Sequence, residues 1–227
     1  WRAAGLPVTM ELVVQRGAEL AVEARQIRAR CNGAVAIKPA SGGSAIGVRK
    51  VSEEEPVERL VQVLAEVLEM DVSALIEPWI DGQELTCGVL EADGRLRALP
   101  PTLILPNRAE FYDFASKYAP GGSNHVCPAP LPDSVIGRVQ ELALRAHQVV
   151  GARDMSRVDF IYDSNQQVDH ALTILEINTL PGMTSTSLYP EAATKAGIAF
   201  ESLVDTLVRQ AQARPRRAQP EVLAMPT

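Results

Sequence analysis

A strand-like segment with a carboxylate inside an apolar run constrains this chain more than any other feature. The segment "ALTILEIN" (171–178) places Glu176 among Leu and Ile side chains, where an unpaired carboxylate is costly. The segment "SRVDFIYD" (156–163) precedes it, and the turn-prone "DSNQQ" joins the two. Together they predict two neighbouring antiparallel strands.

Alternation along these strands suggests a role for Glu176. Alternate residues of a strand share a face, so Arg157 points the same way as Asp159, and Glu176 the same way as Asn178. In an antiparallel pair, these four polar groups converge on one face. The apolar residues expected to fill the other face are Val158, Phe160, Leu175 and Ile177. The oxygen side chains suit Mg²⁺ or Mn²⁺, and such sites leave positions for phosphate oxygens. A structural ion pair of Arg157 with Asp159 or Glu176 is the alternative, and spacing leaves both open.

Strand and helix patterns alternate through the first half of the chain. "GAVAIKP" (33–39) is typical of a short strand, and a glycine-rich connection follows it. Residues 52–70 are expected to form a helix that opens with Ser52 and Glu55 in capping-box spacing. Its apolar residues repeat with helical period: Val57, Leu60, Val61, Leu64 and Leu68.

The second half continues the alternation. Residues 73–80 and 84–99 are expected to form strands, with a hairpin turn at Asp93-Gly94. Residues 106–128 have no clear period and predict a long loop. A second strong helix is expected over 133–150, with Gly151 just past its end. Closing helices (191–197 and 199–211) and a disordered tail (213–227) complete the prediction.

Composition excludes several classes of protein. A net charge of −6 and a pI near 5.2 argue against a nucleic-acid-binding surface over the 227 residues. Charged residues interrupt the apolar stretches before they reach the roughly 20 residues of a membrane span. Cys31, Cys87 and Cys127 lie far apart, which predicts neither zinc nor a disulfide framework and suggests the reducing cytoplasm. The first residues lack an initiating Met and a signal-peptide layout, so we expect further residues before Trp1.

Two segments in the first half could contact a nucleotide. In "KPASGGSAIGV" (38–48), glycines and Ser44 suit a phosphate-cradling loop, and Lys38 could approach a phosphate. An ordinary surface turn and an exposed lysine are the alternative. In "IEPWIDGQEL" (76–85), Glu77, the Trp79–Ile80 backbone and Glu84 could receive a purine amino group and ribose hydroxyls. Two strands joined by a turn explain the same residues.

Two further segments have similar alternatives. "FYDFASKY" (111–118) places Phe111, Lys117 and Tyr118 on the long loop, where they could equally be surface anchors. "NTLPGMTSTSL" (178–188) contains a turn and then small hydroxyl residues with exposed N–H groups. Such groups can hold a carboxylate or an oxyanion, although a Ser/Thr-rich helix cap would look alike.

Taken in order, these segments resemble the ATP-grasp superfamily and, within it, the D-alanine–D-alanine ligase family. The resemblance extends from Trp1 to about Ala211 and is most specific in "LEINTLPGMTSTSLYP" joined to "RVDF" upstream. It implies an α+β fold in which two α+β subdomains with antiparallel sheets clasp ATP. The implied parts are a central subdomain (1–80) with a glycine-rich loop (39–48), a catalytic subdomain (81–212) and the tail (213–227).

The resemblance also implies a role for each matching residue. The residues that would bind ATP are Lys38, Ser44, Glu77, Trp79, Ile80, Glu84, Phe111 and Lys117. The ligands of two Mg²⁺ or Mn²⁺ ions would be Asp159, Glu176 and Asn178. The groups acting on the reacting atoms would be Arg157, Ser44 and the Gly182 N–H. The second amino acid would meet Tyr118, Gly182, Ser187 and Leu188.

The activity implied by the family is ATP-dependent ligation of two D-alanines through an acyl phosphate, for peptidoglycan precursor synthesis by a cytoplasmic homodimer. The alternatives are a D-alanine–D-lactate or D-serine ligase, or a non-catalytic ATP-binding fragment. The chain departs from the family at Gly42 and Ala45, where an acidic residue and a second serine are usual, and at Ala115, often Glu. It also lacks the family's N-terminal domain, which supplies the subsite for the first D-alanine, so the chain alone is expected to bind nucleotide without completing ligation.

Overall fold

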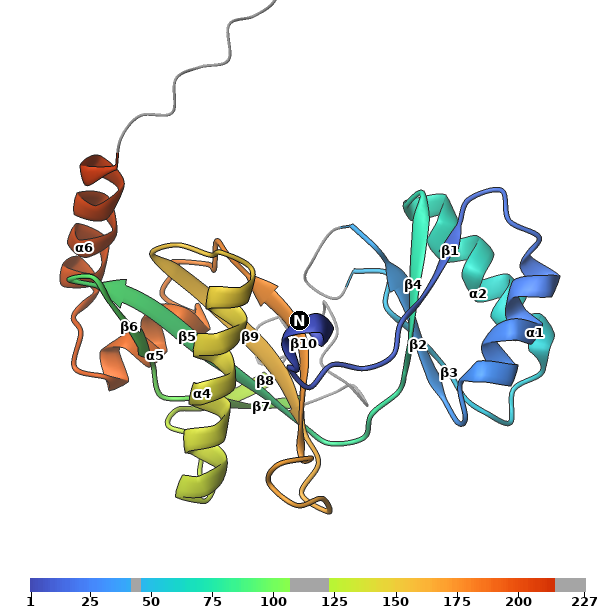
Figure 1. The fold of residues 1–227 in the computed structure, drawn as a ribbon, viewed down its shortest axis with the longest axis horizontal. Helices are drawn as coiled ribbons and strands as arrows, with labels where there is room; N and C mark the ends of the chain where they lie inside the picture. Colours follow the sequence, from blue (N-terminus) through green and yellow to red (C-terminus); the bar gives the residue numbers. More distant parts are fainter. Residues whose placement is uncertain (42–45, 107–122, 215–227) are drawn as a thin grey trace, which may run out of the picture.

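The computed structural model describes residues 1–41, 46–106 and 123–214, and they form two antiparallel sheets with helices packed on them (Figure 1). The smaller sheet has the order β1-β4-β2-β3 and the larger one β10-β9-β5-β7-β8, with β6 paired to β5. The expected α+β class with antiparallel sheets is confirmed. The smaller sheet consists of β1 (Leu12–Gln15), β2 (Val35–Pro39), β3 (Arg49–Val51) and β4 (Ser73–Pro78). The larger sheet consists of β5 (Gln83–Ala92), β6 (Arg95–Ala98), β7 (Thr102–Pro106), β8 (Ser123–Val126), β9 (Met155–Tyr162) and β10 (Leu172–Asn178).

Helices α1 (Leu20–Arg30) and α2 (Val57–Met70) cover one face of the smaller sheet (Figure 1). Leu60, Leu64 and Val67 of α2 are buried against Val35 and Ile37 of β2. This is the apolar face expected from the helical period. Because side chains alternate along a strand, the residues between the buried ones in β2 and β4 point away from both helices.

The start of α2 differs from the prediction. The helix begins at Val57 after Pro56, and Ser52–Glu55 forms a separate turn in which the Ser52 N–H donates to Glu55 Oε2 at 2.6 Å. Proline is tolerated only at the beginning of a helix and disfavours a helical residue before it. The capping-box spacing therefore marks the preceding turn.

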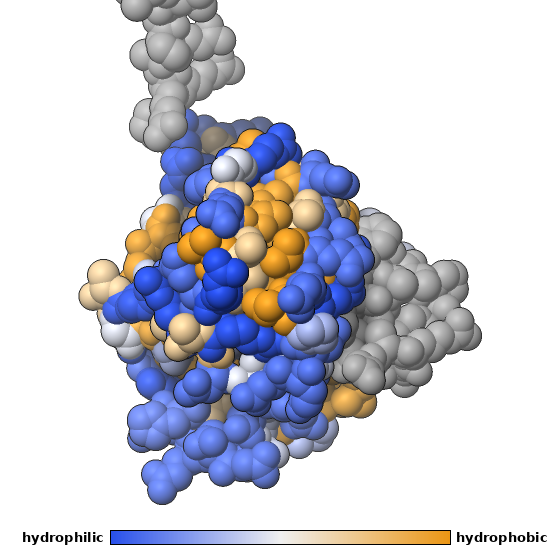
Figure 2. Space-filling model, turned by 90° about the vertical axis from the view of Figure 1, so that its right-hand side faces the viewer, coloured by the Kyte–Doolittle hydropathy of each residue, from blue (hydrophilic) through white to orange (hydrophobic). Residues whose placement is uncertain are grey.

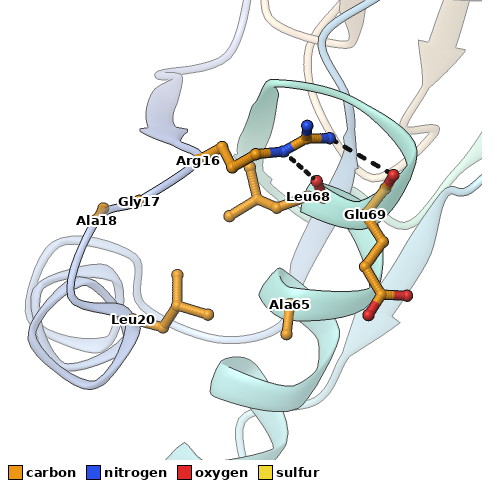
Figure 3. A pocket seen from close by; sticks show the side chains of 7 residues that line it. All are labelled: Arg16, Gly17, Ala18, Leu20, Ala65, Leu68 and Glu69. Atoms are coloured by element: carbon orange, nitrogen blue, oxygen red, sulfur yellow. Dashed lines mark hydrogen bonds between the residues drawn. The ribbon is translucent and has the colours of Figure 1, made fainter.

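Arg16 closes the other end of α2. Its Nε donates to the Leu68 carbonyl at 2.9 Å and its Nη2 to the Asp71 carbonyl at 3.1 Å. A cation at a helix C-terminus satisfies carbonyls that have no partner within the helix. Apolar side chains gather on this helical side of the molecule (Figure 2). A surface pocket of about 470 Å³ lies here, lined by Arg16, Gly17, Ala18, Leu20, Ala65, Leu68 and Glu69 (Figure 3).

Helix α4 (Asp133–Val149) packs on one face of the larger sheet. Its residues Val139 and Leu142 share a core with Leu85, Val158 and Phe160 of the strands. Gly151 follows α4 with a φ of 64°, as expected for the residue past the helix end. The hairpin turn at Asp93-Gly94 is also confirmed, because both residues have positive φ, at 52° and 70°.

Helices α5 (Leu188–Lys195) and α6 (Phe200–Ala213) enclose a second core at one end of this sheet. Tyr189 is fully buried there, and its hydroxyl donates to the Val89 carbonyl at 2.9 Å. The predicted closing helices are therefore present, and α5 begins three residues earlier than expected. No helix of the described residues is long and apolar enough to cross a membrane.

The predicted hairpin of β9 and β10 is present, but it contains a β-bulge. Ile174 pairs with Phe160 and Glu176 pairs with Asp159, so Leu175 is an extra residue between two consecutive positions of β9. Ile174, 2% exposed, takes the place in the core that was expected for Leu175, which is only half-buried. The prediction for Leu175 was wrong because an extra residue reverses the alternation along one strand.

The expected loop over 106–128 is shorter than predicted. Its first residue ends β7, and Ser123–Val126 forms β8, which pairs with β7. Residues 107–122 lie outside the described part of the chain.

The first residues of the chain pack on the larger sheet rather than the smaller one. Leu6 is 4% exposed in the core under α4. The Ile174 N–H donates to the Pro7 carbonyl at 2.8 Å, and Trp1 Nε1 donates to the Ala146 carbonyl at 3.3 Å. The division of the chain into two subdomains at residue 80 stays a prediction. Within the first of these subdomains, residues 1–7 contact the larger sheet.

Candidate functional site

Polar side chains gather on the face of the larger sheet that points away from the core under α4. Asp159 of β9 lies directly between Glu176 of β10 and Thr86 of β5, and Arg157 lies opposite Asn178. Directly opposed residues in antiparallel strands have Cβ atoms about 4.5–5.5 Å apart and share a face. The sheet thus brings together the four polar residues that the sequence pattern predicted to share one face: Arg157, Asp159, Glu176 and Asn178. If Leu175 were instead paired in a regular ladder, Glu176 would face the same side as Ile174, in the core.

Asp159 is the most heavily contacted carboxylate of this face. Arg157 donates from Nε to Oδ1 at 2.9 Å and from Nη2 to Oδ2 at 2.8 Å. The Thr86 hydroxyl donates to Oδ1 at 2.6 Å. The side chains of Arg157 and Asp159 are only 17% and 15% exposed. The structural ion pair considered as an alternative to metal binding is therefore present in this structure.

The oxygen side chains of Asp159, Glu176 and Asn178 still suit a divalent cation. Glu176 is exposed beside the half-buried pair of Arg157 and Asp159, and Asn178 Oδ1 accepts a hydrogen bond from the Leu180 N–H at 2.9 Å. No cluster of three or more His, Cys, Asp and Glu residues suited to a metal occurs in the described ranges. A cation here would have two carboxylates and an amide oxygen, and its other ligands would come from outside the protein. Mg²⁺ is commonly held in this way, by one or two carboxylates and substrate phosphates.

A second polar group lies on the smaller sheet, on the face that α1 and α2 do not cover. Lys38 Nζ is 2.5 Å from Glu77 Oε2, and the side chains are 22% and 16% exposed. The Thr9 hydroxyl donates to the other carboxylate oxygen of Glu77 at 3.0 Å. Lys38 and Glu77, expected to meet different parts of a nucleotide, therefore contact each other.

The connection from β4 to β5 carries the other expected nucleotide contacts. The Trp79 N–H donates to the Ala34 carbonyl at 2.8 Å, and its ring nitrogen donates to Asp81 Oδ1 at 2.9 Å. The Lys50 ammonium lies 4.6 Å from the centre of the Trp79 ring, within cation–π distance. Ile80 lies in the same connection, and Glu84 is in β5, two residues before Thr86 on the same face.

The hydroxyl-rich segment before α5 forms a compact turn. The Ser187 hydroxyl accepts the Thr184 N–H at 3.0 Å and lies 2.8 Å from the Thr184 hydroxyl. Ser187 occupies the N-cap position of α5 without a side-chain capping bond, so the simple helix-cap alternative does not describe it. A Cβ added to Gly182 would lie 2.8 Å from Ser187 Oγ, which places Gly182 against that hydroxyl. Leu188 begins α5 and packs on Ile104.

Several predicted site residues lie outside the described part of the chain. These are Ser44, Phe111, Lys117 and Tyr118, and the departures at Gly42, Ala45 and Ala115 lie there too. Sequence reasoning also missed Thr86 and Lys50. Thr86 alternates with Glu84 along a strand, so the same period-two argument would have found it. The pocket beside Arg16 is lined by none of the predicted site residues.

Comparisons with known proteins agree on one family. A family model described as "D-ala D-ala ligase C-terminus" matches residues 1–209. The D-alanine–D-alanine ligase of Oleidesulfovibrio alaskensis is 47% identical over 172 residues, covering 76% of this chain and 52% of the relative. That of Gluconobacter oxydans is 45% identical over 213 residues, covering 93% and 65%. The crystal structure of the VanG D-Ala:D-Ser ligase from Enterococcus faecalis aligns with a TM-score of 0.76 and 29% identity, covering 92% of this chain and 58% of that one. The chain thus spans about half to two thirds of the length of these relatives.

Proposed function

Because the chain belongs to the D-alanine–D-alanine ligase family through its C-terminal domain, we propose that it is the nucleotide- and metal-binding part of an enzyme that joins two D-alanines. The carboxylate of one D-alanine attacks the γ-phosphate of ATP, forming an acyl phosphate and ADP. The amine of the second D-alanine then displaces phosphate and forms the peptide bond. The product, D-alanyl-D-alanine, serves peptidoglycan precursor synthesis.

The observation that carries this proposal is the shared face of Asp159 and Glu176 beside Arg157. Two Mg²⁺ or Mn²⁺ ions held by Asp159, Glu176 and Asn178 would offset the charge of the ATP phosphates. Arg157 is held by two hydrogen bonds to Asp159, so its guanidinium has a fixed orientation. A fixed donor of this kind stabilises charge on the acyl oxygen without reorganising during the reaction.

The smaller sheet contributes the remaining ATP contacts. Lys38 binds the phosphates, and its pairing with Glu77 keeps the ammonium on the open face before ATP arrives. Trp79 and Ile80 contact the adenine with Glu77, and Glu84 contacts the ribose. Ser44, Phe111 and Lys117 complete the nucleotide site.

The segment before α5 receives the second amino acid. The Gly182 N–H stabilises the acyl oxygen with Arg157, and Ser187 with Leu188 and Tyr118 surrounds the incoming D-alanine. One structural neighbour is named a D-Ala:D-Ser ligase, which is consistent with D-serine as an alternative second substrate but does not favour it. We assign no residue of this chain to the subsite for the first D-alanine, and the part proposed for the chain is binding of ATP, metal and the second amino acid.

The same proposal extends to the cellular compartment and the oligomeric state of the protein. Three free buried cysteines support a reducing compartment, and we place the enzyme in the cytoplasm. A homodimer of the full-length protein rests on the family resemblance alone.

Titration of ATP by calorimetry, with and without Mg²⁺, tests the metal-dependent part. Mg²⁺ is expected to tighten ATP binding to the wild-type chain, and Asp159→Ala or Glu176→Ala is expected to remove that gain. Asp205→Ala, which removes an exposed carboxylate on α6, is the control and should keep it. Mg²⁺-dependent ATP binding that both site variants retain would contradict the assignment.

Product analysis of the full-length protein tests the substrate choice. The enzyme is given ATP and D-alanine, with D-lactate or D-serine in competition. D-alanyl-D-alanine is expected to predominate. A predominant D-alanyl-D-lactate or D-alanyl-D-serine would replace this proposal by one of the alternatives.

A further inference from the structure

We propose that Thr184 is a positioning residue that turns the Ser187 hydroxyl proton toward the carboxylate of the second amino acid. This inference rests on the proposed function, because it concerns the same subsite. Thr184 was not among the residues expected to act in the reaction. Its contacts single it out.

The hydroxyls before α5 form a chain of three. Thr184 Oγ1 lies 3.3 Å from Thr186 Oγ1 and 2.8 Å from Ser187 Oγ. Two backbone N–H groups also form hydrogen bonds across this turn. The Thr184 N–H donates to Ser187 Oγ at 3.0 Å, and the Ser187 N–H donates to the Thr184 carbonyl at 3.1 Å. Ser187 Oγ therefore has two contacts, both from Thr184.

Counting protons decides what the Ser187 hydroxyl can do. A hydroxyl has one proton to donate and two lone pairs to accept with. One lone pair accepts the Thr184 N–H. If the other accepts the Thr184 hydroxyl proton, the Ser187 proton points out of the cluster. If Ser187 instead donates to Thr184, it has no proton left for a ligand.

A carboxylate selects the first arrangement, because it only accepts hydrogen bonds. Thr184 then uses its one proton on Ser187 and accepts the proton of Thr186, so all three hydroxyls donate in one direction. Hydrogen bonds aligned in this way polarise one another, and a charged acceptor at the end strengthens the last one. The arrangement thus turns an ordinary serine into a directed donor for an anion.

Gly182 leaves the space that this donor needs. A Cβ at position 182 would lie 2.8 Å from Ser187 Oγ, closer than real Cβ contacts, and would displace the hydroxyl. Both Gly182 and Thr184 are exposed, so a ligand can approach from solvent. Gly182→Ala keeps the backbone N–H of residue 182 and removes this space, which separates the two uses of the position.

Kinetics of the full-length protein provide the first test. Thr184→Val keeps the shape of the side chain and removes its hydroxyl, and we expect the KM for the second D-alanine to rise about five- to tenfold. Thr184→Ser should restore the wild-type KM. The kcat and the KM for ATP should change less than about twofold, because none of the residues assigned to the ATP site belongs to this chain of hydroxyls.

A double-variant cycle distinguishes positioning from a merely structural role. With Ser187→Ala already present, Thr184→Val should add almost nothing to the KM. Thr194→Val is the matched control, because the Thr194 hydroxyl donates to the Pro190 carbonyl within α5. Independent, multiplying effects of Thr184 and Ser187, or an equal rise in the KM for ATP, would overturn the inference.

Equilibrium binding of amino-acid ligands to this chain tests the inference without requiring the ligation reaction. Titration with D-alanine and with D-alaninamide, which lacks the carboxylate, should show a preference for D-alanine that Thr184→Val reduces about five- to tenfold. Preference without dependence on Thr184, or no preference, refutes the positioning role. Loss of Mg²⁺-dependent ATP binding together with an unchanged preference for D-alanine would contradict the metal assignment alone, so failure of the metal site and failure of the positioning role are distinguishable.

Discussion

Deletion of Leu175 is expected to leave Glu176 opposite Asp159. Leu175 is the extra residue of β10 between the Ile174–Phe160 and Glu176–Asp159 pairs. Without it, these pairs become consecutive in a regular antiparallel ladder, so Ile174 stays in the core and Glu176 stays on the polar face. Deletion of Ile177 is the matched control, because it moves the following residue, Asn178, onto the core face.

The structure predicts a small cost for the first deletion and a large one for the second. Leu175 is half-buried, so its loss removes about 1 kcal/mol of apolar burial. A regained ladder hydrogen bond returns about 0.5–1.5 kcal/mol, and the free energy of unfolding should change by no more than about 1 kcal/mol. Deleting Ile177 removes similar burial and places an amide in the core, for a cost of about 3 kcal/mol.

Urea unfolding followed by circular dichroism measures both free energies, and calorimetry measures ATP affinity with and without Mg²⁺. The variant without Leu175 should unfold near the wild-type midpoint and keep the gain from Mg²⁺. The variant without Ile177 should lose both. If the two deletions are equally damaging, Leu175 is not the extra residue of the ladder, and the reasoning is refuted.

Three further predictions concern the surroundings of the site. Gly88→Ala should lower the free energy of unfolding by about 1–3 kcal/mol in urea, because the new Cβ would lie 3.0 Å from the Tyr189 ring; unchanged stability would contradict this packing. Arg16→Met should lower the melting temperature by about 2–6 °C in calorimetry, because the carbonyls at the end of α2 lose a charged donor; Arg16→Lys should recover part of the loss. Burial lowers the pKa of His147 below its ordinary 6.5, so the unfolded chain binds the proton more tightly, and the free energy of unfolding should fall as pH drops below about 6.5. His147→Gln should flatten this slope in urea titrations at several pH values, and an unchanged slope would assign it to other groups.

Local patterns predicted much of the fold. The period of α2 and α4 and the turn at Asp93-Gly94 depend on residues close together in sequence, and all three are confirmed. The hairpin of β9 and β10 was predicted for the same reason. The bulge at Leu175 was not, because only the register against β9 shows which residue of an apolar run is extra.

The residue types of the candidate site and the possible pairing of Arg157 with Asp159 were predictable, but the contacts between strands far apart in sequence were not. Lys38 and Glu77 lie on different strands 39 positions apart, and their pairing follows from the register of the smaller sheet. Thr86 is an unremarkable strand residue until β5 pairs with β9 and places its hydroxyl on Asp159. Sequence patterns identify such residues singly, whereas sheet formation decides which of them meet.

The path of the first residues has a consequence for synthesis on the ribosome. Trp1 contacts Ala146, 145 residues later, and Pro7 contacts Ile174, whereas the smaller sheet pairs strands that all precede residue 79. The smaller sheet can therefore close while the rest of the chain is still being translated. Pro7 cannot accept its hydrogen bond from Ile174 until β10 emerges, so this segment should be among the last to become protected from amide exchange.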